Sequence, residues 1–219
     1  MKKLLFWMVL IVGIVALIGS CKKDEETAAT AAADNTTSTT SYISTTTTAS
    51  GSITMGDDTL SGVYASECLT SASTIAFFKA TGFWASEVNA YGQVFVVTGS
   101  DNISIELYAF TDTSCSNLSQ SQKTVSDNVT FGSASGSNYP VTYNNQTKAL
   151  TVHTTAAETA LETLYSNALD FIVGTPIELP VSGSGLRYGL WTLSGTTWYE
   201  ASSSSATPTS AGTVPHVKQ

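Results

Sequence analysis

The chain has 219 residues, a formal net charge of −8, and charged side chains at only 12% of its positions. Seventeen acidic residues outnumber nine basic ones, and Arg187 is the single arginine. Because affinity for nucleic acid depends largely on Lys and Arg that neutralise phosphates, this composition argues against a nucleic-acid partner.

The first twenty residues have the order of a secretory signal. Lys2 and Lys3 precede an apolar stretch over residues 4–18, and the small residues Gly19 and Ser20 follow it. A membrane-spanning helix needs about 20 predominantly apolar residues, and this stretch is shorter. We therefore predict a signal peptide over residues 1–20, with a short uncleaved anchor as the alternative.

Cys21 stands where the apolar stretch ends and a run of charge begins. Ile18-Gly19-Ser20-Cys21 resembles a bacterial lipobox, the motif at which lipoprotein signal peptidase cuts before an acylated cysteine. The resemblance implies a lipid anchor on Cys21, and therefore a membrane as partner. Stable attachment needs more than one acyl chain, because a single chain anchors only marginally.

The residues after the cysteine bear on location. Lys22-Lys23-Asp24-Glu25-Glu26 resembles the Lys and acidic cluster with which some Gram-negative groups send lipoproteins to the cell surface, and a solvated spacer is the alternative interpretation. Position 22 is Lys and not Asp, so the common inner-membrane retention signal is absent. We expect the protein to be anchored in the outer membrane, on either the periplasmic or the cell-surface side.

Two segments are predicted to be disordered. Residues 27–52 are nearly all Thr, Ala and Ser and show no apolar periodicity, so they have little surface to bury against the entropy of ordering. We predict a disordered tether over residues 21–58, whose hydroxyls leave O-glycosylation open. A shorter tail is predicted over residues 202–219, where a run of serines is followed by Pro208 and Pro215.

Residues 59–201 carry regular apolar patterning and are predicted to form one β-rich domain. Residues 93–98 are β-branched and aromatic, and in residues 103–110 apolar side chains alternate with Ser104, Glu106 and Tyr108. Short strands between Gly, Asn and Asp turns indicate an all-β fold, a small antiparallel barrel or sandwich. Shorter strand candidates are residues 62–66, 128–132, 141–144 and 149–154.

Two places depart from the strand pattern. Thr155 and Glu158 form a capping box, and Leu161 and Leu164 follow at helical spacing. We therefore predict one amphipathic helix near residues 156–169. Residues 71–85 suit a strand, a short helix or an apolar flap equally well.

Cys68 and Cys115 remain as an even pair once Cys21 is assigned to lipid. An oxidising compartment and an even count favour a disulfide, with two free thiols as the alternative. On the chain-entropy account, closing a loop of this length stabilises the fold by about 4 kcal/mol.

Aromatic residues gather in residues 186–200, which are predicted to form a hairpin. A turn at Ser194-Gly195 pairs Leu193 with Thr196 and places Trp191 opposite Trp198. Such a cross-strand pair contributes up to about 1 kcal/mol as a structural contact. If the face is open, the same two rings, together with Tyr188, are candidate ligand-binding residues for an apolar or sugar ligand.

Catalytic patterns are scarce. The sequence has no Gly-x-Ser-x-Gly elbow, phosphate-binding loop or zinc spacing. His153 is expected to face solvent from its strand, and His216 lies in the predicted tail. Glu67, Glu106 and Asp112 are interpreted as solvated side chains. We predict neither an enzyme nor a metal or other cofactor.

Gly62-Val63-Tyr64 followed by Cys68, and later Tyr108, Asp112 and Cys115, are similar to patterns in small lipocalin-like β domains of bacterial lipoproteins. True lipocalins carry Trp where Tyr64 stands. The resemblance therefore implies the barrel and does not carry ligand binding over to this chain. We expect an extracytoplasmic lipoprotein that acts as a binding module for an apolar or glycan ligand. A structural or adhesive surface lipoprotein with a packed interior is the alternative, and a hydrolase is a third class.

Overall fold

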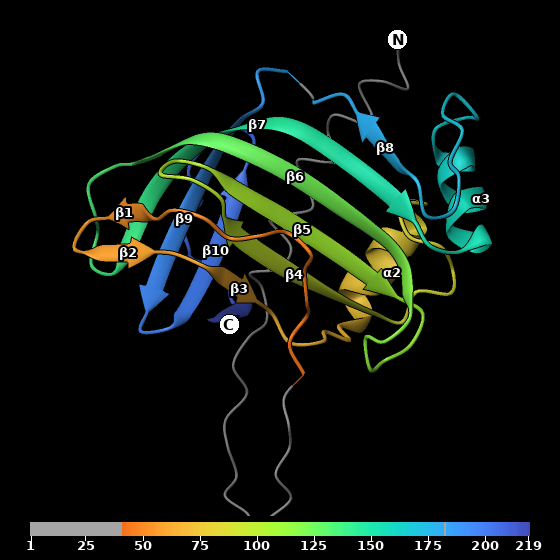
Figure 1. Cartoon of the computed structure of the whole chain (residues 1–219), viewed down its shortest axis with the longest axis horizontal. Helices are drawn as coiled ribbons and strands as arrows, with labels where there is room; N and C mark the ends of the chain where they lie inside the picture. Colours follow the sequence, from red (N-terminus) through yellow and green to blue (C-terminus); the bar gives the residue numbers. More distant parts are fainter. Residues whose placement is uncertain (1–40, 182) are drawn as a thin grey trace, which may run out of the picture.

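The structure is a computed structural model that describes residues 41–181 and 183–219. The predicted signal peptide, the lipobox with Cys21 and the first half of the predicted tether lie outside the described residues. The domain that follows is dominated by one antiparallel sheet (Figure 1).

Eight strands of this sheet close into a barrel. Each strand pairs antiparallel with the next, and the last pairs with the first. This order confirms the predicted all-β antiparallel barrel of lipocalin-like type. In chain order the strands are β3 (Val63–Ala65), β4 (Ala90–Val97), β5 (Ile103–Phe110), β6 (Leu118–Phe131), β7 (Asn138–Val152), β9 (Leu186–Ser194), β10 (Thr197–Ser203) and β11 (Pro215–Lys218).

The strands β6 and β7 are 14 and 15 residues long and pair along most of their length. The sequence predicted only fragments of them, because many of their inward-facing residues are polar and hide the alternation. β9 pairs with β7 from Asn138 to Asn144, and β8 (Pro176–Leu179) pairs with it from Lys148 onward. On this side of β7 the neighbouring strand therefore changes from β9 to β8 near the middle of β7.

An aromatic core fills one end of the barrel. Side chains from seven barrel strands meet there, and the hairpin of β1 (Ile53–Met55) and β2 (Asp58–Leu60) packs against them. Figure 1 shows this hairpin at the opposite end of the molecule from the helices. The buried members are Ile53, Met55, Leu60, Tyr64, Phe95, Val97, Ile103, Val129, Val141, Tyr143, Trp191 and Trp198.

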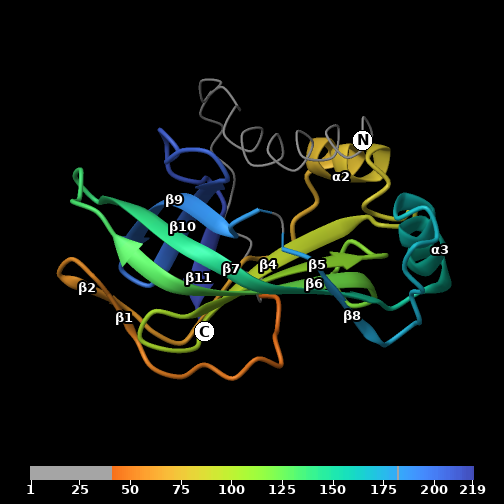
Figure 2. The same ribbon diagram turned by 90° about the horizontal axis from the view of Figure 1, so that it is seen from above.

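Two helices cover the far end (Figure 2). α2 (Ala72–Ala80) packs Ile75 and Phe78 against inward-facing residues of β4 and β5, and α3 (Thr155–Leu164) packs Leu161 against the end of β7. The open interpretation of residues 71–85 is thus decided in favour of a short helix. No helix among the described residues has the length and apolar character needed to cross a bilayer.

The predicted helix α3 is present with different ends. Thr154, and not Thr155, is the N-cap, and its hydroxyl accepts a hydrogen bond from the Ala157 amide at 3.1 Å. The helix stops at Leu164 because Ser166 and Asn167 both take φ of 56°, which no α-helix continues.

Residues 41–50 form an ordered strap on the outer wall, which corrects the prediction of a disordered tether up to residue 58. Ile43 is buried beside the apolar outer face of β4, and its amide donates to the Ser66 carbonyl at 3.1 Å. At the other end of the strap, Ser50 donates to the Val97 carbonyl at 2.9 Å. A single Ile among threonines gives no periodic signal, and its burial depends on the distant wall.

The C-terminal segment was predicted to be a disordered tail, and the structure corrects this as well. β11 pairs with β10 on one side and β3 on the other, and so closes the barrel. A strand of four residues that begins with Pro215 carries too little local pattern to be predicted. Pairing with the edges of β10 and β3 stabilises it.

The disulfide between Cys68 and Cys115 is present, with Cα atoms 5.7 Å apart. It joins the segment between β3 and α2 to the loop that follows β5. The predicted pairing of these cysteines is confirmed.

Candidate ligand site in the barrel interior

The β9–β10 hairpin has a different register from the predicted one. Trp198 pairs with Leu193, and Trp191 pairs with Glu200, so Gly195 and Thr196 form the turn. Gly195 has φ of 61°, which suits glycine at the first central position of a two-residue turn. A shift of two positions keeps every side chain on its face. Both tryptophans therefore point inward as predicted, but as diagonal neighbours.

The tryptophan pair belongs to the packed core. Both side chains are 0% exposed, and their ring centroids lie 4.6 Å apart with an interplanar angle of 65°. Trp198 also meets Phe95 at 4.6 Å and Tyr64 at 5.4 Å between centroids. The pair is a structural contact and not an exposed stacking floor.

Tyr188 does not join the two tryptophans. It pairs with Thr142 and Ser203 and lies an odd number of positions from Trp191, so its side chain is on the outer face of β9. The three candidate ligand residues therefore do not form one group, because strand alternation places Tyr188 on the opposite face of β9 from Trp191.

Beyond the tryptophans the inner face of the barrel becomes polar. We call this surface the inner polar face. All of its residues share the inward side of their strands with core residues, and all except Thr124 keep partial exposure, so solvent reaches this half of the interior. Its members are Gln93, Gln122, Thr124, Lys148, Arg187, Glu200 and Ser202.

The charges on this face are held in a poorly solvated setting. Burial, together with the charge of Arg187, lowers the pKa of Lys148 to about 8. Burial raises the pKa of Glu200 to about 7, although the Ser202 hydroxyl works in the opposite direction. Burial and the Glu200 carboxylate raise the pKa of Tyr143, which pairs with Arg187 across β7 and β9.

These charges are not paired with one another. In the described part of the chain the one ion pair within 4.0 Å joins Lys123 to Glu106 on the outer wall. Arg187 and Lys148 therefore lie inside the barrel without a carboxylate in contact. Buried or half-buried charges are normally paired with an opposite charge. These two cations lack such a partner.

Uncharged polar atoms nearby also lack partners. Trp191 Nε1, Trp198 Nε1 and Gln120 Oε1 are buried and have no hydrogen-bond partner among the described residues. A Cβ built on Gly189 would lie 2.9 Å from Trp191 Nε1. The indole N–H thus lies over Gly189, the inward-facing position between Trp191 and Arg187, and next to the inner polar face.

The two histidines lie in separate places on the barrel wall. His216, expected in a disordered tail, is 1% exposed in the barrel wall, where Nδ1 lies 3.3 Å from the Trp198 carbonyl and Nε2 lies 3.3 Å from Gln93 Oε1. Burial lowers its pKa to about 4. His153 is half-buried and its Nε2 lies 3.1 Å from the Ser121 hydroxyl. The described residues contain no cluster of His, Cys, Asp or Glu that would hold a metal ion.

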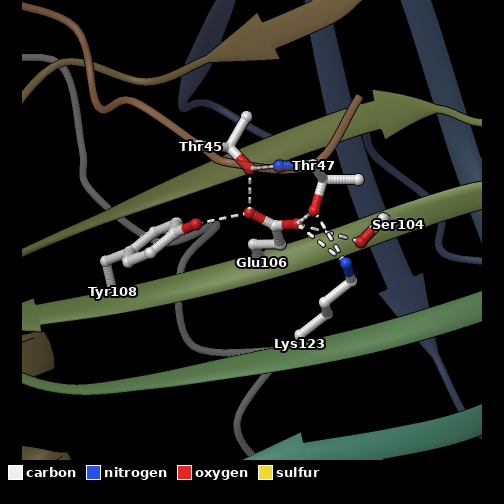
Figure 3. A network of polar contacts seen from close by, with 6 residues as sticks. All are labelled: Thr45, Thr47, Ser104, Glu106, Tyr108 and Lys123. Carbon is white, nitrogen blue, oxygen red and sulfur yellow. Dashed lines mark hydrogen bonds and ion pairs between the residues drawn. The ribbon is translucent and has the colours of Figure 1, made fainter. Parts of the chain in front are cut away.

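Glu106 is the centre of a second polar cluster, on the outer wall under the strap (Figure 3). It is 3% exposed, which corrects its interpretation as a solvated side chain. Thr45 donates to Oε2 at 2.5 Å, Ser104 donates to Oε1 at 3.1 Å, and Thr47 and Tyr108 donate as well. Burial raises the pKa of the carboxyl, but these four hydroxyl donors outweigh it and hold the pKa below its usual value.

The Glu106 cluster fastens the strap. Both carboxylate oxygens accept hydrogen bonds from strap hydroxyls, and Lys123 Nζ lies 3.9 Å from Oε1 and donates to Thr47. Every oxygen is satisfied by protein. Glu67 is exposed, and Asp112 accepts hydrogen bonds within its own loop, so neither joins Glu106. The cluster is a structural clasp.

No protein-family model matches this chain, and a search of curated proteins finds no match either.

The sequence analysis missed the inner polar face. Strand alternation carried the signal, because Arg187 shares its parity with Gly189 and Trp191, and Lys148 shares its parity with Leu150 and Val152. A charged residue at an inward-facing position of a predicted strand indicates that part of the barrel interior is polar.

Proposed function

We propose that this protein is a lipid-anchored, extracytoplasmic binding module of the outer membrane, which holds a small ligand in the barrel interior. The observation that carries the proposal is the inner polar face. A barrel that serves only as a scaffold gains most by packing its interior with apolar side chains. Here the inner polar face carries amides, hydroxyls and three ionisable groups that are partly open to solvent.

Of the two ligand classes expected from the sequence, the polar one is favoured. The aromatic rings that would receive an apolar ligand are fully buried against one another. The accessible inward groups of Gln93, Gln122 and Ser202 are hydrogen-bond donors and acceptors, which suit the hydroxyls of a glycan.

The test is a thermal-stability screen of the full chain in detergent against mono- and oligosaccharides, with apolar fluorescent probes in a parallel arm. A sugar that binds the folded state raises the melting temperature by mass action. Ser202→Phe, which fills the inner face, should abolish the rise. Ser203→Phe, one position along β10 and on the outer face, is the matched control and should retain it.

Two outcomes contradict the proposal. No rise with any sugar, and no saturable probe binding, would favour the structural or adhesive alternative. A rise that survives Ser202→Phe would place the ligand outside the barrel.

A further inference from the structure

The inner polar face carries more positive charge than its own carboxylate can balance. Arg187 projects inward from β9, and Lys148 projects inward from β7, where it pairs with Thr124 and Leu179. The two cations are close enough for the charge of Arg187 to disfavour protonation of Lys148. Placing like charges together inside a barrel destabilises the fold unless something else compensates them.

The inward carboxyl nearest in the fold does not compensate them. Glu200 lies on β10 opposite Trp191, outside ion-pair distance of both cations. Burial favours its neutral form. The other carboxylates named above, Glu106 and Asp112, are on the outer wall or in a loop and are satisfied there. Among the described residues, neither cation therefore has a carboxylate within 4.0 Å.

The indole of Trp191 supplies an independent observation. Its side chain is 0% exposed, its N–H has no acceptor among the described residues, and it lies over Gly189 on the side toward Arg187. A buried donor left unmade costs about 1–3 kcal/mol. Such groups in native proteins usually have a partner, so an acceptor atom is expected at this position inside the barrel.

We propose that Arg187 and Lys148 bind an acid group of the ligand inside the barrel, with the Trp191 indole donating to an oxygen beside it. This deepens the proposed function and rests on it. The planar guanidinium of Arg187 can hold either a carboxylate or a phosphate with two parallel hydrogen bonds. We assign the acid group as a carboxylate, and phosphate is the competing anion that the experiment distinguishes. The amide and hydroxyl groups of Gln93, Gln122 and Ser202 then face the hydroxyls. The ligand class is an acidic sugar or a similar polyhydroxy acid.

The experiment follows the indole N–H resonance of Trp191 by NMR in the full chain labelled with isotopic tryptophan, in detergent. Trp191→Phe assigns the resonance. The probes are glucuronate, glucose and a glucose phosphate. We expect glucuronate to shift the resonance saturably and to bind about tenfold or more tightly than glucose, as for one charge-assisted contact.

Variants locate the effect. The Arg187→Gln, Lys148→Gln double variant should weaken glucuronate about tenfold or more, to the level of glucose. Arg187→Lys keeps the charge and loses the planar fork, so its affinity for glucuronate should lie between those of the wild type and the double variant. It replaces the double variant in the test if that variant folds poorly. Lys123→Gln removes one charge from the outer wall and should leave glucuronate binding unchanged.

Each other outcome decides against a specific step. Equal binding of glucose and glucuronate, unaffected by the double variant, overturns the acid group and leaves the proposed binding function standing. Tighter binding of the phosphate than of glucuronate overturns the carboxylate assignment. If none of the three probes moves the resonance, the acid-sugar site is overturned, and the saccharide and apolar screen with Ser202→Phe decides the binding function separately.

Discussion

His216 and Glu200 show how single residues in this barrel depend on their surroundings. His216 lies near the chain end, yet β11 carries it into the wall, where Phe95 packs edge-on against its ring at 4.7 Å between centroids. Burial favours the neutral forms of both side chains. Their effects on stability therefore have opposite dependence on pH.

Replacing Glu200 by Gln should stabilise the protein in mildly alkaline solution and not in acid. The folded-state pKa of Glu200, about 7, lies above the usual 4.5. A raised carboxyl pKa contributes stability that is lost as pH rises from about 4.5 through 7. Gln resembles the protonated form, so the melting temperature of Glu200→Gln should exceed wild type at pH 8 and match it near pH 4.5.

Equal melting temperatures of the Glu200→Gln variant and the wild type at all pH values would show that the Glu200 carboxyl is solvated. The measurement is a series of thermal melts in buffers of constant ionic strength.

Trp198→Ala should cost about 3–5 kcal/mol of unfolding free energy, the usual range for a large aromatic removed from a core. Its ring is 0% exposed and touches Tyr64, Phe95 and Trp191. Tyr188→Ala, on the outer face of the same hairpin and partly exposed, should cost about 1 kcal/mol or less. Urea unfolding of the full chain in detergent measures both, and equal losses would contradict the inward placement of Trp198.

At the scale of elements, the strap is held by its threonines. Alternate strap residues face the wall, and Thr45 and Thr47 donate to Glu106 while Thr46 is exposed. In a run of threonines this alternation leaves no apolar pattern, so only the buried carboxylate on β5 distinguishes one threonine from the next.

The Thr45→Val, Thr47→Val double variant should detach the strap. It keeps side-chain shape but removes two of the four hydroxyl donors to a carboxylate that is 3% exposed. Hydrogen bonds to charged groups contribute about 1.5–3 kcal/mol each. Hydrogen exchange at the Ile43 and Ser50 amides should then accelerate, while exchange in β4 stays slow. Thr46→Val is the matched control, and acceleration there too would show that the clasp does not fasten the strap.

For the whole molecule, the strap is where the described domain continues toward the predicted lipid at Cys21. Fatty-acid labelling of expressing cells should mark the wild type and the Cys68→Ser, Cys115→Ser variant alike, and should spare Cys21→Ser. The reason is that acylation requires the thiol of the lipobox cysteine, whereas the disulfide cysteines lie in the folded domain. Equal labelling of Cys21→Ser and wild type would remove the lipid anchor from the proposed function.

The sequence by itself determined the features that depend on near neighbours. The alternation in residues 103–110, the helical spacing around Leu161 and the even pair of Cys68 and Cys115 predicted an all-β domain with one helix and a disulfide, and the structure has each of them. These signals are local because strand and helix periods repeat within a few residues.

Only the tertiary structure decided what depends on distant partners. β11 is a strand because two open edges flank it, and Glu106 is buried because a strap sixty residues earlier in the chain crosses it. Arg187 of β9 and Lys148 of β7 share the inner face because β9 pairs with the first half of β7. Such pairings are non-local, and a single sequence carries no periodic trace of them.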